Sequence, residues 1–446
     1  MKDRVLELMN ETPVNLVKLH DMINKMNTVD VADVFEELSK EKAAPAFRLL
    51  SKDIAADVFS YISPDKQQII VEALTDTEVG NIINELFVDD AVDFIEEMPA
   101  NVVRRVLQNV NDDRRQIINQ LLRYPEDSAG SIMTTEYVAL KEDTTVREAF
   151  DVIRTTGVDK ETIYTCFVIR RDRLLVGVVS AKALMLSKQH SRIGDIMDTK
   201  LLFAHTTDDQ EAIASQFRKY SLLSMPVVDT EQRLVGIVTV DDIVQVMEEE
   251  ATEDFEKMAA ITPSEDPYMK TSALKHSKNR IPWLMFLMLS ATITGGIISS
   301  FENALAAVPA LVTFIPMLMD TGGNAGSQSS TLIIRGLALG EIEFRDILSV
   351  IWREVRVGIL CGLALGVVNF VRIFLMNDGD YVLCIVVTLS LIATVLISKT
   401  VGCILPLLAK KVKMDPAIMA APLVTTIVDA TSLIVFFSIA RSIFGL

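Results

Sequence analysis

The sequence predicts a multidomain protein: an all-α superhelical N-terminal domain, an α/β region built from two similar copies, a connecting helix, and a transmembrane domain of five α-helices. Three observations predict this fold class. A helical motif recurs every 24 residues near the N-terminus, a second motif occurs twice between Gly130 and Val246, and five apolar segments follow Ile281. The expected domains cover residues 1–128 (helical repeats), 129–247 (the two copies), 248–280 (connecting helix and linker) and 281–446 (membrane domain).

The charge of the chain is unevenly distributed. The net charge is −17, with 13 Lys and Arg against 10 Asp and Glu from Thr271 onward, so the residues before Thr271 carry −20. Such acidity favours cations as partners and argues against nucleic acid. The four cysteines form no CxxC pair and the four histidines are scattered, which disfavours zinc and copper sites. Neither a phosphate loop nor a nucleophile–base pair is evident, so we do not expect an enzyme.

The N-terminal motif consists of VADVFEEL from Val31, AADVFSYI from Ala55 and VGNIINEL from Val79, with other apolar helical segments in the intervals. Short paired helices at constant spacing are typical of an α-hairpin solenoid, in which each unit buries its apolar face against its neighbours. A generic helical bundle is the alternative. Both interpretations predict an acidic, helical domain.

The second motif aligns SIMTTEYVALKEDTTVREAFDVI with GDIMDTKLLFAHTTDDQEAIASQF, which places Met133 opposite Met197. Further along, LLVGVVSAKALML aligns with RLVGIVTVDDIVQVM, which places Gly177 opposite Gly236. Each copy predicts the order strand, helix, strand, strand, helix. This pattern resembles a tandem pair of CBS domains, which serve as regulatory rather than catalytic modules.

The CBS resemblance also implies a nucleotide site. In such domains a Thr or Ser and an Asp three residues later often hold a nucleotide ribose. The second copy keeps this spacing at Thr239 and Asp242, whereas the first copy has Ser180 and Ala183. The resemblance therefore allows an adenine nucleotide, ATP for example, in one copy only.

An acidic helix is predicted after the second copy. The stretch VMEEEATEDFEKM carries six acids, and the residues that follow, with Pro263, Pro267 and a basic end, predict a linker that reaches the membrane. Most charge runs are solvated helix faces, and this is the alternative. The position of the helix between an acidic module and the membrane favours a functional role.

Five apolar segments of spanning length follow, over residues 281–301, 309–334, 347–375, 381–409 and 416–445. Lys275, Lys278 and Arg280 precede the first segment, and the loops after the second and fourth are also basic. The loops after the first and third segments contain no Lys or Arg. By the positive-inside rule, we expect a multi-pass protein of the cell membrane with a cytoplasmic N-terminus and a C-terminus outside.

One acid, Asp429, lies near the centre of the fifth apolar segment. A carboxylate at that depth is energetically costly, so an intramembrane acid is by default a functional-site hypothesis. A structural ion pair is the alternative, but no basic residue lies within three helical turns before Asp429 and the next one after it is Arg441. We expect Asp429 to face a water-filled path and to meet a cation.

The second apolar segment contains the motif MDTGGNAGSQSSTLIIRG. If the segment is helical, it has a polar face made of Asp320, Asn324, Gln328, Thr331 and Arg335. The glycines of the motif allow a second helix to approach closely or the backbone to unwind. A helix-packing face held by glycines and amide groups is the alternative, and five aligned polar residues argue against it.

The fifth segment has a similar face, made of Pro422, Thr425, Thr426 and Asp429. Because Pro422 has no N–H, we expect a free carbonyl one turn before it, with the Thr425 carbonyl on the same side as Asp429. A stripe of oxygen atoms without sulfur or imidazole suits a hard cation such as Mg2+, Ca2+ or Mn2+. One acid per chain holds Mg2+ poorly, so we expect a twofold dimer in which two Asp429 carboxylates flank the ion.

The whole pattern resembles the MgtE family of magnesium transporters. The order of helical repeat, tandem CBS pair, acidic connecting (plug) helix and five spans matches, as do GGNAGSQSSTLIIR, the DPA at Asp415 and the acid in PLVTTIVD. The resemblance implies a homodimeric, Mg2+-selective channel for magnesium uptake, with Mg2+ held by Asp429 and Thr425. The pore lining would include Asp320, Asn324 and Gln328.

The same resemblance implies that Mg2+ closes the pore by binding to acids outside the membrane. The candidate ligands are Asp57, Asp89, Asp93, Glu211, Asp242, Glu250, Glu253, Asp254 and Asp415. Independently, a module of charge −20 should repel itself when ion-free and compact when divalent ions bridge its carboxylates. We expect Asp254 and Asp415 to share an ion that ties the sensor to the gate.

Two alternatives stay open. One is a broader divalent carrier that also takes Mn2+ or Co2+. Block by hexaamminecobalt, which mimics hydrated Mg2+, separates the two. The other is a membrane-anchored ion or nucleotide sensor that conducts nothing, in which case Asp429→Ala changes nothing.

Overall fold

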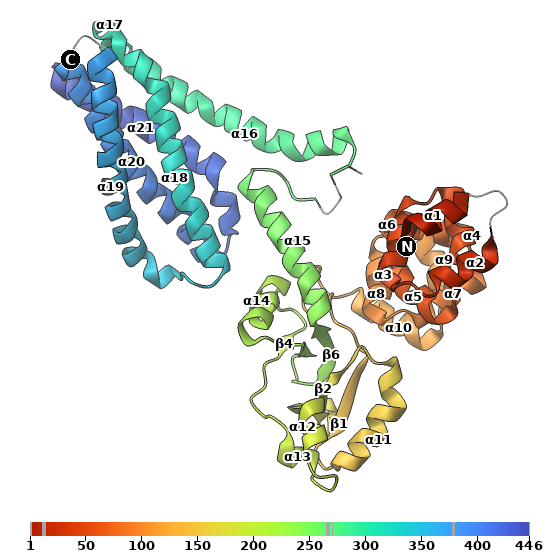
Figure 1. Ribbon diagram of the computed structural model, residues 1–446. Helices are drawn as coiled ribbons and strands as arrows, with labels where there is room; N and C mark the ends of the chain where they lie inside the picture. The colour runs from red at the N-terminus through yellow and green to blue at the C-terminus, as the bar shows by residue number, and fades with distance from the viewer. Residues whose placement is uncertain (1, 11–14, 265–267, 270, 377–379, 446) are drawn as a thin grey trace. The chain divides into compact units, whose positions relative to one another are not determined.

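The computed structural model describes residues 2–10, 15–264, 268–269, 271–376 and 380–445. The chain forms two compact units, residues 1–247 and 248–446, whose helices and strands are labelled in Figure 1. The order of elements confirms the predicted fold class, with helical repeats, two α/β copies, a connecting helix and long apolar helices.

The first unit begins with the repeat helices. The helices that carry the 24-residue motif begin at residues 28, 52 and 76, and α9, at residue 100, continues the spacing. The alternating helices begin at residues 40, 64, 88 and 112. This double spacing confirms the predicted hairpin repeat. The bounds are α1 Lys2–Asn10, α2 Leu16–Ile23, α3 Thr28–Glu37, α4 Lys40–Phe47, α5 Lys52–Ser60, α6 Pro64–Ala73, α7 Asp76–Glu85, α8 Val88–Glu96, α9 Ala100–Asn109 and α10 Asp112–Leu121.

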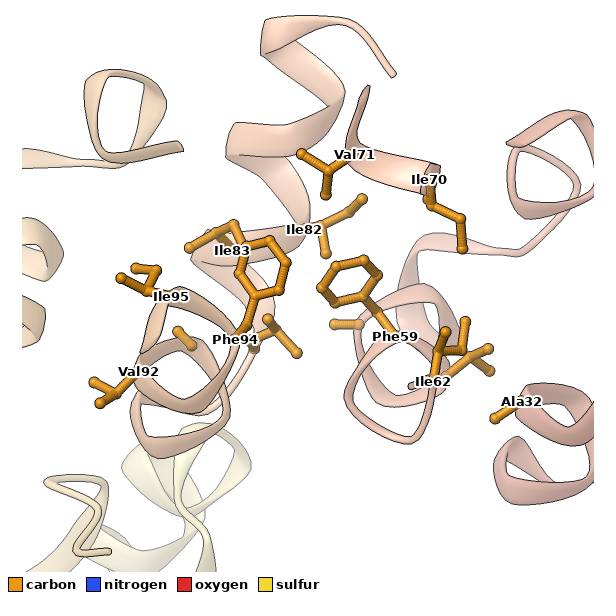
Figure 2. Close-up of a cluster of buried hydrophobic side chains, with 14 of the residues drawn as sticks. Ala32, Phe59, Ile62, Ile70, Val71, Ile82, Ile83, Val92, Phe94 and Ile95 are labelled. Atoms are coloured by element: carbon orange, nitrogen blue, oxygen red, sulfur yellow. The ribbon is translucent and has the colours of Figure 1, made fainter. Parts of the chain in front are cut away.

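The repeat places large apolar side chains of successive helices against one another. Phe35, Phe47, Phe59 and Phe94 form a chain of edge-to-face contacts, with ring centroids 5.8, 6.0 and 5.1 Å apart. All four are buried, and Figure 2 shows Ile83 beside Phe94. Because Phe35 and Phe59 occupy equivalent positions of consecutive units, the core is continuous along the repeat.

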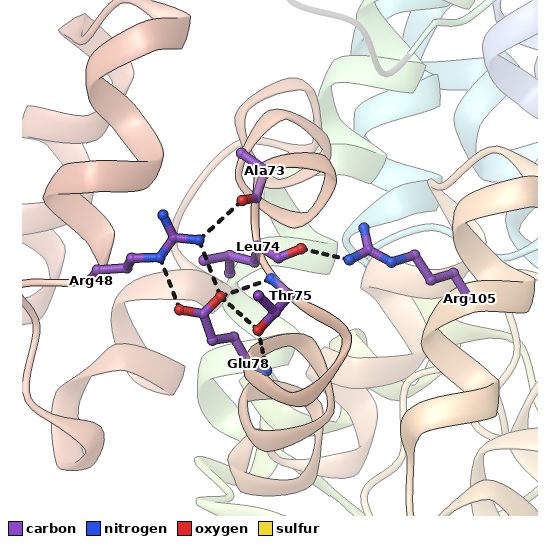
Figure 3. Close-up of polar contacts among 6 residues, drawn as sticks. All are labelled: Arg48, Ala73, Leu74, Thr75, Glu78 and Arg105. Carbon is purple, nitrogen blue, oxygen red and sulfur yellow. Dashed lines mark hydrogen bonds and ion pairs between the residues drawn. The ribbon is translucent and has the colours of Figure 1, made fainter.

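Two arginines fasten the end of α6, as Figure 3 shows. Arg48 pairs with Glu78, with 2.8 Å between Nε and Oε1, and donates to the Ala73 carbonyl. Arg105 of α9 donates to the Leu74 carbonyl. These contacts satisfy carbonyl groups at a helix end, which have no partner within the helix itself.

The two α/β copies have the predicted order of elements. In each, the first two strands run parallel and the third is antiparallel to the second. The first copy contains β1 Tyr137–Lys141, α11 Val146–Thr156, β2 Thr162–Ile169, β3 Leu175–Ser180 and α12 Ala181–Leu186. After the short α13 Ile193–Ile196, the second contains β4 Ala204–His205, α14 Gln210–Tyr220, β5 Ser224–Val228, β6 Leu234–Thr239 and α15 Val240–Met258.

The residues that the alignment matched pack crosswise between the copies. A Cβ atom added to Gly177 in β3 would lie 2.5 Å from the sulfur of Met197, and one added to Gly236 in β6 would lie 2.6 Å from the sulfur of Met133. Each methionine thus fills the space left by the glycine of the other copy. The two copies therefore form one interlocked module.

The second unit contains a long helix at each of the five predicted apolar segments. The acidic stretch forms the second half of α15, and residues 265–267 and 270 of the predicted linker lie outside the described residues. The long helices are α16 Ala273–Ser300, α18 Ile315–Ala338, α19 Ile347–Met376, α20 Tyr381–Lys411 and α21 Ala421–Phe444, with the short α17 Glu302–Ala307 after α16. The fifth begins later than predicted, because a 3-10 turn, η5 (Pro416–Met419), precedes it.

Hydropathy separates α18 from the other long helices. In the described part of the chain, four helical stretches are long and apolar enough to cross a membrane, and they contain α16, α19, α20 and α21. The length of α18 is sufficient, but its sequence is rich in Gly, Ser and polar residues. Five spans therefore stay a prediction.

Glycines bring α18 into close contact with α20 and α21. A Cβ atom added to Gly402 of α20 would lie 2.2 Å from the carbonyl oxygen of Gly326. One added to Gly322 would lie 3.0 Å from Val428 of α21, and one added to Gly323 would lie 3.0 Å from a methyl group of Thr425. The predicted close approach at these glycines is confirmed.

Candidate functional site

The polar face of α18 is exposed in the single chain. Asp320, Asn324, Gln328, Thr331 and Arg335 all lie on this face, whereas the glycines of the helix are buried against its neighbours. In a bilayer, an exposed polar stripe is unfavourable against lipid tails. In a membrane we therefore expect water or another protein surface beside this polar face.

Asp429 lies on α21, half-buried and away from basic side chains. Within the described residues, the charged group that acts on it is Asp320 of α18, another acid. Two like charges in an apolar bundle repel one another, and a cation near both relieves that repulsion. This arrangement disfavours the alternative of a structural ion pair.

The start of α21 differs from the expectation. Pro422 lies in the first turn of the helix, where a missing N–H frees no carbonyl, so the predicted free carbonyl one turn earlier is wrong. The Pro422 carbonyl instead accepts from the hydroxyls of Thr425 at 3.0 Å and Thr426 at 2.9 Å. The side chain of Thr425 also contacts Gly323, so α18 and α21 meet at this level.

A second group of acids gathers in the first unit, where α8 meets the start of β2 and of α15. Burial raises the pKa of Asp89 well above its usual value, and repulsion from Asp242 adds to the effect. Burial and repulsion from Asp242 raise the pKa of Asp90 to about 7, while burial and repulsion from Asp241 raise that of Glu161 to about 8. Burial also raises the pKa of Asp242 to about 6. These acids form one electrostatically coupled cluster.

Two carboxylate oxygens of the cluster lack a hydrogen-bond partner in the described part of the chain. Within the described residues, Asp89 Oδ1 and Glu161 Oε2 are buried without a hydrogen-bond donor. Buried carboxylate oxygens of this kind are unusual, and a hard divalent cation suits them. No three described carboxylate, His or Cys groups converge as a ready-made inner shell. Mg2+ usually keeps several of its waters, so a site for it does not require such an inner shell.

The predicted ligands divide into two sets. Asp57 belongs to the cluster, because its charge acts on Asp90. Asp93 lies on the exposed side of α8, and Glu211 lies in the exposed first turn of α14. The structure therefore does not gather all of the predicted cytosolic ligands at one place.

Sequence reasoning missed Asp90 and Glu161. Asp90 has a sequence signal, because it directly follows Asp89 in the DDAVD motif. Glu161 has none, because it lies in a turn before β2 and only the fold brings it to α8.

At the membrane unit, an ammonium group lies between the predicted acids. Lys257 Nζ of α15 is 2.6 Å from Asp415 Oδ2 and 2.5 Å from Glu253 Oε1. Burial alone would lower the pKa of Lys257, but these two carboxylates outweigh it and raise the pKa. Burial and then repulsion from Asp415 raise the pKa of Asp254 to about 6, and Glu250 adds to this repulsion. The acids are close together, and Lys257 is a partner that the sequence did not suggest.

A cleft of about 350 Å³ adjoins Thr239 in the first unit. It is lined by Glu161, Thr162, Tyr164, Leu223, Thr239, Val240 and Asp241. The Thr239 hydroxyl donates to Asp242 at 2.6 Å, so a ribose would have to replace this contact. The acids of the lining repel a polyphosphate unless a cation accompanies it. In the first copy, Ser180 caps α12 by accepting from the N–H of Ala183.

The chain matches known families over most of its length. The MgtE family, described as a divalent cation transporter, matches residues 315–439, the MgtE intracellular N domain matches 26–127, and the CBS domain matches 129–188 and 193–249. The magnesium transporter MgtE of Thermus thermophilus is 39% identical over 358 residues, which cover 79% of each chain. That of Bacillus subtilis is 35% identical over 380 residues, covering 84% of this chain and 83% of the other.

Two solved structures are similar to about half of the chain. The cytosolic domain of the Mg2+ channel MgtE in complex with ATP covers 55% of this chain and 100% of its own, with 33% identity and a TM-score of 0.52. The soluble part of a magnesium transporter covers 56% of this chain and 98% of its own, with 28% identity and a TM-score of 0.52. By its domain order and by identity across most of its length, the chain belongs to the MgtE family of divalent cation transporters.

Proposed function

We propose that the protein transports Mg2+ across the cell membrane along α18 and α21, and that Mg2+ bound outside the membrane closes this path. The observation that carries the proposal is the exposed polar face of α18 beside the intramembrane Asp429. The relatives in Thermus thermophilus and Bacillus subtilis, both magnesium transporters, support Mg2+ as the ion.

The proposed path offers oxygen atoms and holds the ion weakly. Asp429 and Thr425 of α21 contact hydrated Mg2+, and Asp320, Asn324 and Gln328 of α18 line the path. Because Mg2+ loses its waters reluctantly, contact through water lets it bind and leave quickly. A twofold dimer supplies a second Asp429 and covers the exposed polar face.

The proposed sensor is the carboxylate cluster of the first unit together with the acids near Lys257. We keep as ligands Asp57, Asp89, Asp242, Glu250, Glu253, Asp254 and Asp415, and also Asp93 and Glu211, which lie outside these two groups. We add Asp90 and Glu161, supported by their burial and their repulsion from neighbouring acids. Mg2+ neutralises acids that otherwise repel one another, so the ion-bound form is the compact and closed one.

A chain of contacts connects α15 to the proposed pore helix. Asp415, which pairs with Lys257, also accepts from the N–H of Ala417 at 2.7 Å and so caps η5. At the other end of η5, the Met419 carbonyl accepts from the Ser330 hydroxyl of α18 at 2.7 Å. A shift of α15 therefore acts on α18 through η5. In the proposed gating step, Mg2+ replaces the Lys257 ammonium at the Asp415 carboxylate.

Three finer assignments belong to the same proposal. The first two domains and the connecting helix are cytoplasmic and the C-terminus lies outside, supported by the basic loops of the sequence. The division at residues 128, 247 and 280 separates the helical-repeat domain, the CBS pair, the connecting helix and the pore domain. ATP binds in the cleft beside Thr239, supported by the ATP complex of the similar cytosolic domain.

Flux of Mg2+ into liposomes that contain the purified full chain tests the ion path. We expect Asp429→Asn to reduce the initial rate by at least about tenfold, because the proposed site loses its charge. Glu302→Gln, an exposed acid outside the proposed path, is the matched control and should keep the wild-type rate. Equal flux through Asp429→Asn and wild type would overturn the path. Block by hexaamminecobalt supports a hydrated ion, and its absence supports the broader divalent carrier.

A further inference from the structure

Two charged residues inside the helical bundle have no place in the proposed ion path. They are Glu354 of α19 and Lys399 of α20, of which Lys399 is only 5% exposed. Ser329 of α18 lies between them: its hydroxyl donates to Glu354 Oε2 at 2.6 Å and accepts from Lys399 Nζ at 3.4 Å. One hydroxyl thus connects an acid and a base on two helices to a third helix.

The network lies beside the closest crossing in the bundle. Gly326 and Gly402, whose backbones meet, are each three residues from a member of the network, Ser329 on α18 and Lys399 on α20. Charges buried within a membrane bundle are expensive, and an apolar pair of similar volume is often at least as stable. Stability alone is therefore a poor reason for a lysine at this position.

The network faces away from the proposed ion path. At 100° per residue, Ser329 lies about 140° around α18 from the middle of the stripe that contains Asp320, Asn324 and Gln328. The stripe is exposed and Ser329 is buried, in agreement with opposite faces. The ammonium of Lys399 is then roughly one helix diameter, about 10–12 Å, from an ion on the stripe.

We infer that Glu354, Ser329 and Lys399 form a charge-neutral clamp that positions α18 and prevents Lys399 from repelling the transported cation. This inference rests on the proposed ion path along α18. An unpaired ammonium at this distance repels a divalent ion, and with screening between that of a protein interior and that of bulk water its affinity changes by roughly tenfold. The negative charge of Glu354 cancels the electric field of the Lys399 ammonium. The Ser329 hydroxyl bonds to both side chains and holds them against α18, which lines the path. The three are positioning residues and do not touch the ion.

The test is a charge series in liposomes, with the initial Mg2+ flux measured as a function of Mg2+ concentration. Glu354→Gln leaves the positive charge and should raise the half-saturating concentration by about tenfold. Lys399→Met leaves the negative charge and should lower the half-saturating concentration. The double variant E354Q/K399M is neutral again and should return near the wild-type value. E354Q is also combined with Lys399→Arg, because a guanidinium stays protonated in surroundings where an unpaired ammonium would lose its proton. The E354Q/K399R variant should raise the half-saturating concentration as E354Q does.

Controls separate this effect from simple loss of structure. Arg353→Gln and Glu302→Gln change the same formal charges at exposed positions and should leave the half-saturating concentration unchanged. Ser329→Ala keeps both charges and should lower the maximal rate more than it shifts the half-saturating concentration. The clamp is overturned if the loss of Mg2+ flux in every variant follows its loss of thermal stability, whatever the sign of the charge that remains. The ion path is judged separately by Asp429→Asn, so either assignment can fail without the other.

Discussion

At the scale of single residues, the acids around Asp89 are placed where they cannot all carry charge in an ion-free protein. Asp90 and Glu161 have pKa values of about 7 and 8, raised first by burial and then by neighbouring acids. Between about pH 4 and pH 8, the folded chain therefore binds protons that the unfolded chain has already lost. Stability then falls as the pH rises through this range. In the proposed sensor, Mg2+ would compete with protons for the same oxygen atoms.

This competition predicts the pH dependence of stability. Without Mg2+, we expect the unfolding midpoint of the purified full chain to fall by a few degrees as the pH rises from about 5.5 to about 8. With Mg2+ present the fall should be smaller, because the ion neutralises the carboxylates. The measurement is thermal unfolding across the pH series with and without Mg2+. The double variant Asp90→Asn, Glu161→Gln should show a smaller dependence than the wild type, and an ion-free midpoint that rises with pH contradicts the assignment.

At the scale of elements, α18 has two faces with different tasks. Its glycines are buried against α20 and α21, while its polar stripe is exposed. The same helix is tied by Ser329 to Glu354 and by Ser330 to the Met419 carbonyl of η5. This explains its low hydropathy, because few of its positions are left for lipid. In the proposed gating, a helix held in this way would transmit small shifts at η5 to the polar stripe.

The packing of α18 predicts the effect of an added methyl group. Gly402→Ala places a Cβ atom 2.2 Å from the Gly326 carbonyl oxygen, so α18 and α20 must separate. We expect a loss of about 1–3 kcal/mol in stability, seen as a lower unfolding midpoint in detergent, together with reduced Mg2+ flux.

Gly362→Ala of α19 is the matched control for this prediction. Its added Cβ would lie no closer than 3.4 Å to any neighbour, which is ordinary contact. It should therefore keep both the midpoint and the flux of the wild type. Equal midpoints for the two variants would contradict the close crossing of α18 and α20.

At the scale of the whole molecule, the proposed function divides the charge between the two units. In the proposal, the acids of the first unit and of the connecting helix bind Mg2+, and the long apolar helices of the second unit supply the path. The helix α15 belongs to both, since it begins in the second α/β copy and carries Lys257 to Asp415. Ion binding in the first unit therefore has a covalent route to the membrane unit.

Limited proteolysis of the full chain tests this coupling. We expect Mg2+ to slow cleavage between the first unit and the membrane helices, because the ion-bound form is compact. The variant with Asp89→Asn and Glu161→Gln should show little protection, whereas Glu302→Gln should be protected as the wild type is. Cleavage that Mg2+ leaves unchanged in the wild type counts against the sensor.

Much of the fold could be predicted, because it follows from patterns of residue type and spacing in the sequence. The 24-residue spacing, the matched pairs Met133–Met197 and Gly177–Gly236, and the five apolar segments each follow from periodicity or composition. Pro422 was misjudged, because the start of α21 depends on the turn at η5 and not on hydropathy. Lys257 follows a run of acidic residues, so from the sequence its side chain would be expected to face solvent.

The sequence by itself determined the fold class, the family and the acid near the centre of the fifth apolar segment. These depend on residue type and spacing along one segment, which periodicity makes visible. Only the tertiary structure decided which charges meet: Asp89 with Glu161, Lys257 with Asp415, and Glu354 with Lys399 through Ser329. The physical reason is that electrostatic energy depends on distance and burial in three dimensions, which the spacing of residues along a chain does not determine.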